Sequence, residues 1–192
     1  HEICNAKGSL LSKSRIAAIF SCWPDGTDLR KHCDGGMDNP VELAFFPEGQ
    51  MIGSVNLLNM PVRNDALVHW MWGGVYPRHD VLSAIPDLKR TGEVLGGTVN
   101  FGHVALSGIT RLRSDPQPDR WTLLVTEYNT HKVRRVDVQR SGSTYRGKIH
   151  DLLTSTDEGV YFTDVVEDAD GSLLVINTGG WFNHCPELRS TD

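Results

Sequence analysis

The sequence lacks any long hydrophobic run. No apolar segment reaches the roughly 18 residues that a membrane-spanning helix needs, so no membrane span is expected in this segment. The 19 basic and 24 acidic residues are mixed along the chain and give a net charge of −5. Because no basic block occurs, nucleic acid and anionic membrane surfaces are not expected as partners. The chain begins with His1 and shows no signal-peptide pattern, from which we expect a mature product or a piece of a longer protein.

Signature motifs of several enzyme and cofactor classes are also missing. The cysteines Cys4, Cys22, Cys33 and Cys185 form no Cys-x-x-Cys pair. This argues against a zinc ribbon, a thioredoxin-type site and covalent haem attachment in this segment. A disulfide between Cys22 and Cys33, which flank one predicted hairpin, is not favoured by the position of the turn. No Gly-x-Ser-x-Gly elbow, phosphate-binding glycine loop or dinucleotide fingerprint occurs.

Helical periodicity is weak, and short apolar segments separated by Gly, Pro, Asn and Asp dominate. This pattern is typical of an all-β protein. The region Pro77–Gly97 is assigned an outer strand and an excursion with room for one helical turn. The other expected strands are Arg15–Cys22, Asp28–Cys33, Val41–Phe46, Met51–Asn56, Ala66–Trp72, Gly108–Arg113, Trp121–Glu127, Lys132–Val138, Tyr145–His150, Val160–Val166 and Ser172–Asn177.

Two stretches repeat one hairpin pattern, with apolar strands around a turn glycine, Gly49 or Gly171, that follows an acidic residue. Grouping the strands in fours gives units of about 40–50 residues or more, which are typical of the blades of a β-propeller. We therefore predict an all-β, partial β-propeller with about three four-stranded blades, cut from a longer ring. A β-sandwich with two similar hairpins is the alternative. The expected divisions are a partial blade at 1–38, blades at 39–106 and 107–159, and a partial blade at 160–192.

The longer, polar loops are expected to lie together on one face of such blades. The A-to-B turns, Pro47–Gly49 and Asp168–Gly171, are short and open on the other face. Because function concentrates in loops on a rigid scaffold, the face with the longer loops is predicted to be the functional one. These loops are Asp34–Pro40, Gly96–Leu106, Thr154–Thr163, Asn56–Leu67, Tyr128–Lys132 and Asn177–Pro186.

Two histidines and an arginine stand out on this face. His103 comes just before an inner strand, where a neutral imidazole could take a proton from a hydroxyl group; bonding to a loop carbonyl is the alternative. His131 and Arg135 could bind an anionic or polyhydroxyl ligand, and structural bonding between blades is equally open. Glu42 and Asp164, near the starts of inner strands, could coordinate Ca²⁺, but capping of backbone amides is favoured.

A second polar group and several tryptophans complete the candidates. Arg63, with Asn64, Asp65 and His69, is placed on one loop and could fork onto a carboxylate or an acidic cofactor. Trp181 could stack on a sugar or a flat cofactor, although packing between blades is the commoner role of such a residue. Trp70 and Trp72 alternate on one strand and are expected in the core or between blades.

A family resemblance rests on stretches that cover most of the chain. They are Asn39–Leu43, Asp65–Trp70, Gly73–Pro77, Gly102-His103 with Ser107-Gly108, His131–Val133 with Arg135, Thr163–Val165, Glu167–Val175 and Gly179–Phe182 with Cys185-Pro186. Through them the chain resembles the exported, propeller-containing membrane-bound dehydrogenases of planctomycetes and verrucomicrobia, which are often joined to a haem c domain. One departure is Leu106, which stands where this family is expected to have a cysteine.

That family is distantly similar to soluble glucose and sorbosone dehydrogenases, six-bladed propellers that use pyrroloquinoline quinone with Ca²⁺ and a histidine base. The resemblance implies hydride transfer from a sugar or alcohol hydroxyl to a quinone, with His103 as the base. Arg63, His131, Arg135 and Trp181 would orient cofactor or substrate. It also implies export to the periplasm or cell surface, further blades, and haem c in a domain outside this sequence.

Two other functions remain open. A non-catalytic propeller could bind carbohydrate or protein at the same face. A lactonase-like hydrolase would need several metal-binding carboxylates that converge on the channel, and Glu42 and Asp164 are the evident ones.

Overall fold

The computed structural model describes residues 1–59, 63–115, 117 and 119–179, without the side chains of 57–59 and 63. These residues form one short helix, α1 (His79–Ser83), and otherwise strands. None of the described residues belongs to a helix long and apolar enough to cross a membrane. The strands are β1 (Glu2–Cys4), β2 (Leu10–Lys13), β3 (Ala18–Ser21), β4 (Arg30–Asp34), β5 (Pro40–Phe45), β6 (Met51–Asn59), β7 (Arg63–Trp70), β8 (Val99–Gly102), β9 (Leu106–Arg111), β10 (Arg120–Glu127), β11 (Lys132–Ser141), β12 (Thr144–Thr154), β13 (Phe162–Glu167) and β14 (Leu173–Asn177).

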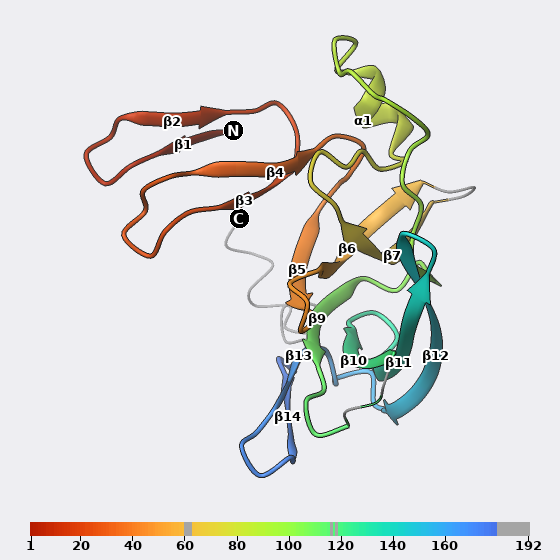
Figure 1. The fold of residues 1–192 in the computed structure, drawn as a ribbon. Helices are drawn as coiled ribbons and strands as arrows, with labels where there is room; N and C mark the ends of the chain where they lie inside the picture. The colour runs from red at the N-terminus through yellow and green to blue at the C-terminus, as the bar shows by residue number, and fades with distance from the viewer. Residues whose placement is uncertain (60–62, 116, 118, 180–192) are drawn as a thin grey trace, which may run out of the picture.

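Two four-stranded antiparallel meanders, β5-β6-β7-β8 and β9-β10-β11-β12, form the centre of the molecule (Figure 1). Three hairpins, β1–β2, β3–β4 and β13–β14, make separate two-stranded sheets. The first strands of successive sheets lie next to one another, since β9 contacts both β5 and β13. Meanders placed around their first strands are the blades of a propeller. The predicted fold class, an all-β partial β-propeller, is therefore confirmed.

The apolar alternation of the strands builds the core between the two four-stranded sheets. On β10 and β11, Leu123, Val125, Val136 and Val138 are all at most 1% exposed and face the neighbouring sheet. Phe46, from the β5–β6 turn, stacks on the ring of Trp121 at 4.7 Å between centroids. Smaller buried clusters lie between β3–β4 and the first four-stranded sheet, and between β13–β14 and the second four-stranded sheet. The fold thus depends on contacts between faces of consecutive sheets, as a radial arrangement requires.

The outer strand of the first meander was assigned wrongly. The range Gly96–Leu106 was expected to be a loop, but its middle forms β8, in which Asn100 pairs with Ala66 of β7. The strand is short and its register with β7 is irregular, which weakens the sequence signal. Tertiary packing favours it, because the Val99 side chain is 6% exposed in the core between the sheets. The excursion before it carries α1, the expected helical turn.

The two tryptophans of the β7 segment have different environments, although both were expected to be buried. Trp70 is 2% exposed, whereas Trp72 is 68% exposed. The strand ends at Trp70, so the alternation that places Trp70 in the core no longer governs the direction of Trp72. The prediction for Trp72 was therefore wrong.

Side chains of neighbouring sheets bind the open edges of the first strands. Glu42 Oε2 accepts the N–H of Ile109 at 2.8 Å, and Arg111 Nε donates to the carbonyl of Phe45 at 3.0 Å. Ser107 Oγ likewise donates to the carbonyl of Thr163 at 2.7 Å. Without these side chains, the backbone N–H and C=O groups at the strand edges would have no hydrogen-bond partner. An unpaired backbone group costs free energy where water is excluded. Consecutive first strands are joined by side chains in place of a continuous backbone ladder.

The two carboxylates discussed as calcium ligands take part in amide capping, as favoured above. Glu42 binds an amide of the next blade, and Asp164 Oδ1 accepts the N–H of Val165 at 2.7 Å. Burial raises the pKa of Glu42, and the nearby charge of Asp164 raises it further. The hydrogen bond from the Ile109 N–H lowers this pKa but does not cancel the increase.

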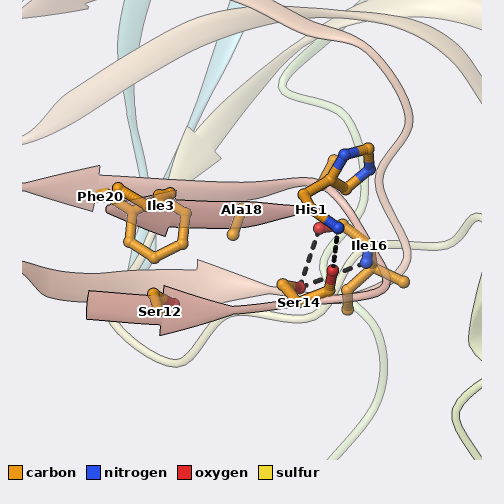
Figure 2. Close-up of a pocket in the computed structure, with 8 residues that line it drawn as sticks. His1, Ile3, Ser12, Ser14, Ile16, Ala18 and Phe20 are labelled. Carbon is orange, nitrogen blue, oxygen red and sulfur yellow. Dashed lines mark hydrogen bonds between the residues drawn. The ribbon is translucent and has the colours of Figure 1, made fainter. Parts of the chain in front are cut away.

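The hairpins at the N-terminal end enclose a small cleft (Figure 2). The His1 ammonium donates to the Ser14 carbonyl at 2.7 Å, and Ile3, Ala18 and Phe20 line the space. Its volume of about 200 Å³ lies below the roughly 300 Å³ at which small-molecule sites begin. We regard it as a packing gap between β1–β2 and β3. Nearby, Cys33 is buried and free, and burial raises the pKa of its thiol to about 11.

The contact between Gly36 and the 76–78 segment gives a first testable prediction. A Cβ atom at Gly36 would lie 1.5 Å from the Tyr76 carbonyl oxygen, and Arg78 N donates to the Gly36 carbonyl at 2.8 Å. Gly142 has the same φ of +63°, but nothing lies within 4 Å of the place that a Cβ atom would occupy there. Gly142→Ala should lower the free energy of unfolding by about 1 kcal/mol through backbone strain alone. Gly36→Ala should lower it by at least roughly 3 kcal/mol, because overpacking adds to that strain.

Urea unfolding of the two variants and the parent chain measures this difference. Equal losses in both variants would show that the close contact at Gly36 does not constrain the fold.

Candidate functional site

Three connections meet at one end of the two central sheets. They are 103–105 between β8 and β9, 128–131 between β10 and β11, and 155–161 between β12 and β13; together we call them the loop rim. Tyr128 N donates to the Ala105 carbonyl at 3.0 Å, and Asn129 N donates to the Val104 carbonyl at 3.1 Å. The backbones of the loops that carry His103 and His131 are therefore joined directly.

A buried carboxylate fixes the first of these loops. Asp65, on β7, is 1% exposed, and its Oδ2 accepts the N–H groups of Val104 at 2.9 Å and Ala105 at 2.6 Å. Ala105 adopts a left-handed φ of +55°, which an L-residue takes only when its surroundings compensate for the strain. Charged acceptors make the stronger hydrogen bonds, so Asp65 stabilises this loop conformation. In the sequence, Asp65 was grouped with Arg63, Asn64 and His69 as one polar loop, and its anchoring of the His103 loop was not predicted.

His103 projects from this fixed loop toward solvent. Its side chain is exposed, whereas Val104 beside it is 7% exposed and anchored in the core between the sheets. The imidazole makes no hydrogen bond to any described residue. An exposed imidazole on a rigid backbone can accept a proton from a bound ligand.

His131 lies at the rim but is engaged in structure. Its Nδ1 donates to the carbonyl of Val160, so the proton of a neutral ring sits on Nδ1 and Nε2 remains an acceptor. The ring packs edge-on against Tyr161 at 4.9 Å, and Tyr161 lies 4.6 Å from the ring of Tyr128. We call Tyr128, His131 and Tyr161 the aromatic cluster. It gives the rim next to the His103 loop a half-buried surface of rings.

Arg135 does not reach the loop rim. Its guanidinium binds Asp115 at 2.7 Å, Asp137 at 3.1 Å and Thr122 at 3.3 Å. Asp115 belongs to the connection between β9 and β10, at the opposite end of the sheet. Burial alone would lower the pKa of Arg135, but the bonds to Asp137 and Asp115 raise this pKa above its ordinary value. The side chain bonds within its own blade.

The polar group around Arg63 is not one loop. Arg63 opens β7 opposite Asn59, and its side chain lies outside the described residues. His69 is at the far end of the same strand, where its Nε2 lies 2.8 Å from Gln50 Oε1. Because a strand advances about 3.3 Å per residue, Asp65 and His69 belong to opposite ends of the sheet. Trp181, the remaining candidate, lies outside the described residues.

The described residues do not fit the implied quinone and calcium ion. They contain no group of three or more His, Cys, Asp and Glu side chains that could hold a metal. Arg134 is bound to Glu127 at 2.8 Å and also to Asp151, and Arg135 is ion-paired as above. The carboxylates of pyrroloquinoline quinone would therefore meet cations that already have acidic partners.

Comparison with known proteins shows a likeness in fold. No family model matches the chain, and no curated protein matches it. A solved structure described as a "putative oxidoreductase (glucose dehydrogenase)" from Thermus thermophilus is similar with a TM-score of 0.54 and 16% sequence identity. The likeness covers 76% of this chain and 39% of that one, so the chain spans well under half the length of this neighbour. At this identity it shows the fold alone, which is distantly similar to a glucose dehydrogenase-like propeller.

The role of Asp65 can be tested apart from any activity. Asp65→Ala leaves the N–H groups of Val104 and Ala105 without their acceptor, and should lower the free energy of unfolding by about 3 kcal/mol. Hydrogen exchange at these two amides should become much faster. Asp65→Asn keeps one carbonyl acceptor and should have the smaller effect.

The matched control is Asp157→Ala, which removes an exposed carboxylate that accepts the Gly159 N–H at 2.8 Å in the same rim. It should change stability by less than about 0.5 kcal/mol. Unchanged protection of Val104 and Ala105 in Asp65→Ala would refute the anchoring role.

Proposed function

We propose that this chain forms part of an oxidoreductase that oxidises a hydroxyl group of a sugar or alcohol, with His103 as the general base. The observation that carries the proposal is the exposed imidazole of His103 on a loop held by the buried carboxylate of Asp65. A base must keep its position while the ligand binds, and this loop has few ways to move. The distant likeness to a glucose dehydrogenase-like fold supports the same reaction class.

The residues at the rim would have two separate roles, proton transfer and orientation of the substrate. His103 accepts the proton of the substrate hydroxyl, and the hydride of the same carbon leaves to an acceptor, so that a carbonyl product forms. The Tyr128 and His131 rings lie on the neighbouring loop and would orient the substrate, together with Arg63 and Trp181. Arg135 is left out of this arrangement because its guanidinium is bound at the other end of the sheet.

The hydride acceptor is proposed to be a quinone, pyrroloquinoline quinone with Ca²⁺, on the basis of the family resemblance. A haem c domain outside this sequence would take the electrons onward, and the protein would be exported. The described residues do not fit the quinone. Its ligands are expected from Arg63, Trp181 and blades outside this chain.

A non-catalytic propeller that binds carbohydrate is the second candidate. The aromatic cluster favours it, because ring faces at a rim are a common surface for sugar binding, and its rings are packed together without a proton-transfer role. On this alternative, His103 would contact a ligand without chemistry. The two functions therefore predict different consequences of replacing His103.

Dye-linked oxidation by the full-length protein tests the enzyme assignment. A panel of sugars and alcohols is offered with and without pyrroloquinoline quinone and Ca²⁺. His103→Ala should lower kcat by roughly 10²–10⁴-fold, the usual contribution of a general base. The control is His79→Ala, which removes an exposed histidine on α1, away from the rim, and should retain full activity.

Two results would contradict the enzyme assignment. One is a parent protein that reduces no dye with any substrate. The other is a His103→Ala variant that keeps the parent kcat. Sugar binding by calorimetry without turnover would then support the binding module.

A further inference from the structure

The excursion between β7 and β8 carries α1 (Figure 1). Residues of this excursion line a second cleft. Its walls are residues of 71–75 and 89–95, and its volume is about 430 Å³. This lies within the roughly 300–1,000 Å³ of small-molecule sites. It is also more than twice the volume of the N-terminal gap.

The wall formed by 71–75 is held firmly against the blade. Leu95 N donates to the Val75 carbonyl at 2.7 Å, and this bond joins the two walls. Met71 N donates to the Tyr76 hydroxyl at 3.1 Å, and that hydroxyl donates to the His69 carbonyl at 2.7 Å. Tyr76 is fully buried, so the cleft has a rigid base. The 71–75 wall therefore loses little conformational freedom on binding.

An exposed indole forms one side of the cleft. Trp72 is 68% exposed, although a large aromatic ring is normally buried. The ring of His32 contacts it edge-on at 4.8 Å and limits its movement. Because Trp72 belongs to the lining of the cleft, a flat apolar face bound there can stack on the exposed part of its indole.

Positive charge forms the other side. Lys89 and Arg90 line the cleft and make no ion pair with any described residue, while Glu93 is the acidic residue of the lining. The lining therefore carries a net charge of +1 (two cations minus one anion), although the whole chain carries −5. A local excess of positive charge on an acidic protein favours an anionic ligand at this place. Arg90 can bind a carboxylate in a forked geometry.

We propose that this cleft binds an acidic sugar, a uronate unit of an oligosaccharide. The indole of Trp72 stacks on the apolar face of the pyranose ring, and Lys89 and Arg90 bind the carboxylate. The Thr91 hydroxyl and the Gly92 N–H are donors for the ring hydroxyls. A neutral sugar would leave the two cations without a partner, and an apolar ligand would have to desolvate them.

The cleft is separate from the loop rim. Asp65, which holds the His103 loop, and Trp70, which ends the strand before the cleft, are five residues apart on β7, or about 17 Å. Binding at the cleft therefore does not depend on the proposed oxidation. It would provide a second contact for an acidic polymer whose chain continues beyond one site.

Calorimetry and tryptophan fluorescence on the full chain test the proposal with trigalacturonate as the probe. We expect saturable binding that quenches Trp72 fluorescence and weakens at high salt. Maltotriose, an uncharged trisaccharide, should bind at least tenfold more weakly, since it lacks the charged hydrogen bonds.

Variants assign the binding to these side chains. Trp72→Ala should weaken binding roughly fivefold to tenfold. The double change of Lys89→Ala with Arg90→Ala should weaken it at least tenfold. The matched controls are Trp23→Ala, which removes an indole 62% exposed in the β3–β4 connection, and Lys7→Ala, which removes an exposed cation near the N-terminus. Both should bind as the parent does, and circular dichroism checks that every variant is folded.

Several results would overturn the proposal. They are the absence of saturable trigalacturonate binding, equal affinity for maltotriose, and equal weakening by Trp23→Ala and Trp72→Ala. Tighter binding of adenosine monophosphate than of trigalacturonate would also overturn the sugar assignment, because a flat aromatic anion would then be the better ligand.

Discussion

The first strand of each blade has one open edge, and the rest of the structure depends on how that edge is satisfied. Neighbouring first strands in a propeller do not form a continuous hydrogen-bond ladder, so side chains must supply the partners. Glu42, Arg111 and Ser107 do so between consecutive blades. The blades also approach closely, because a Cβ atom at Gly108 would lie 2.6 Å from the Asp164 Cα. These contacts set the spacing and direction of the sheets.

That spacing brings the loops of different blades together at the rim. The His103 loop follows one sheet and the 128–131 turn lies within the next, yet their backbones are joined by two hydrogen bonds. A buried carboxylate from β7 then fixes the first loop. Rigidity at the rim is thus a consequence of how the blades pack. A site for proton transfer or for sugar binding can be built there because the scaffold does not need to reorganise.

Much of the fold was evident from local sequence. The alternation of Leu123 with Val125 and of Val136 with Val138 predicted two strands of the second meander, and these residues do face the core. The turn glycines Gly49 and Gly171 both adopt left-handed φ values, +84° and +86°. The strand β8 escaped detection because it is short and depends on contacts with β7 and on the burial of Val99. The hairpin β1–β2 also escaped detection; Leu10 and Leu11 are exposed there, so no buried face produces an alternating pattern.

For the candidate residues too, some properties could be predicted from neighbouring residues, whereas others depend on contacts between distant segments. Local patterns were enough to locate most of the strands, the turns and His103 in a loop, because period and turn dihedrals depend on residues close together in the chain. They did not indicate which polar side chains are engaged, since that depends on the packing of distant segments. Asp65 binds a loop 39 residues away and Arg135 reaches Asp115 across 20 residues, while Lys89 and Arg90 face a cleft. These assignments depend on contacts between distant segments, which no local pattern encodes.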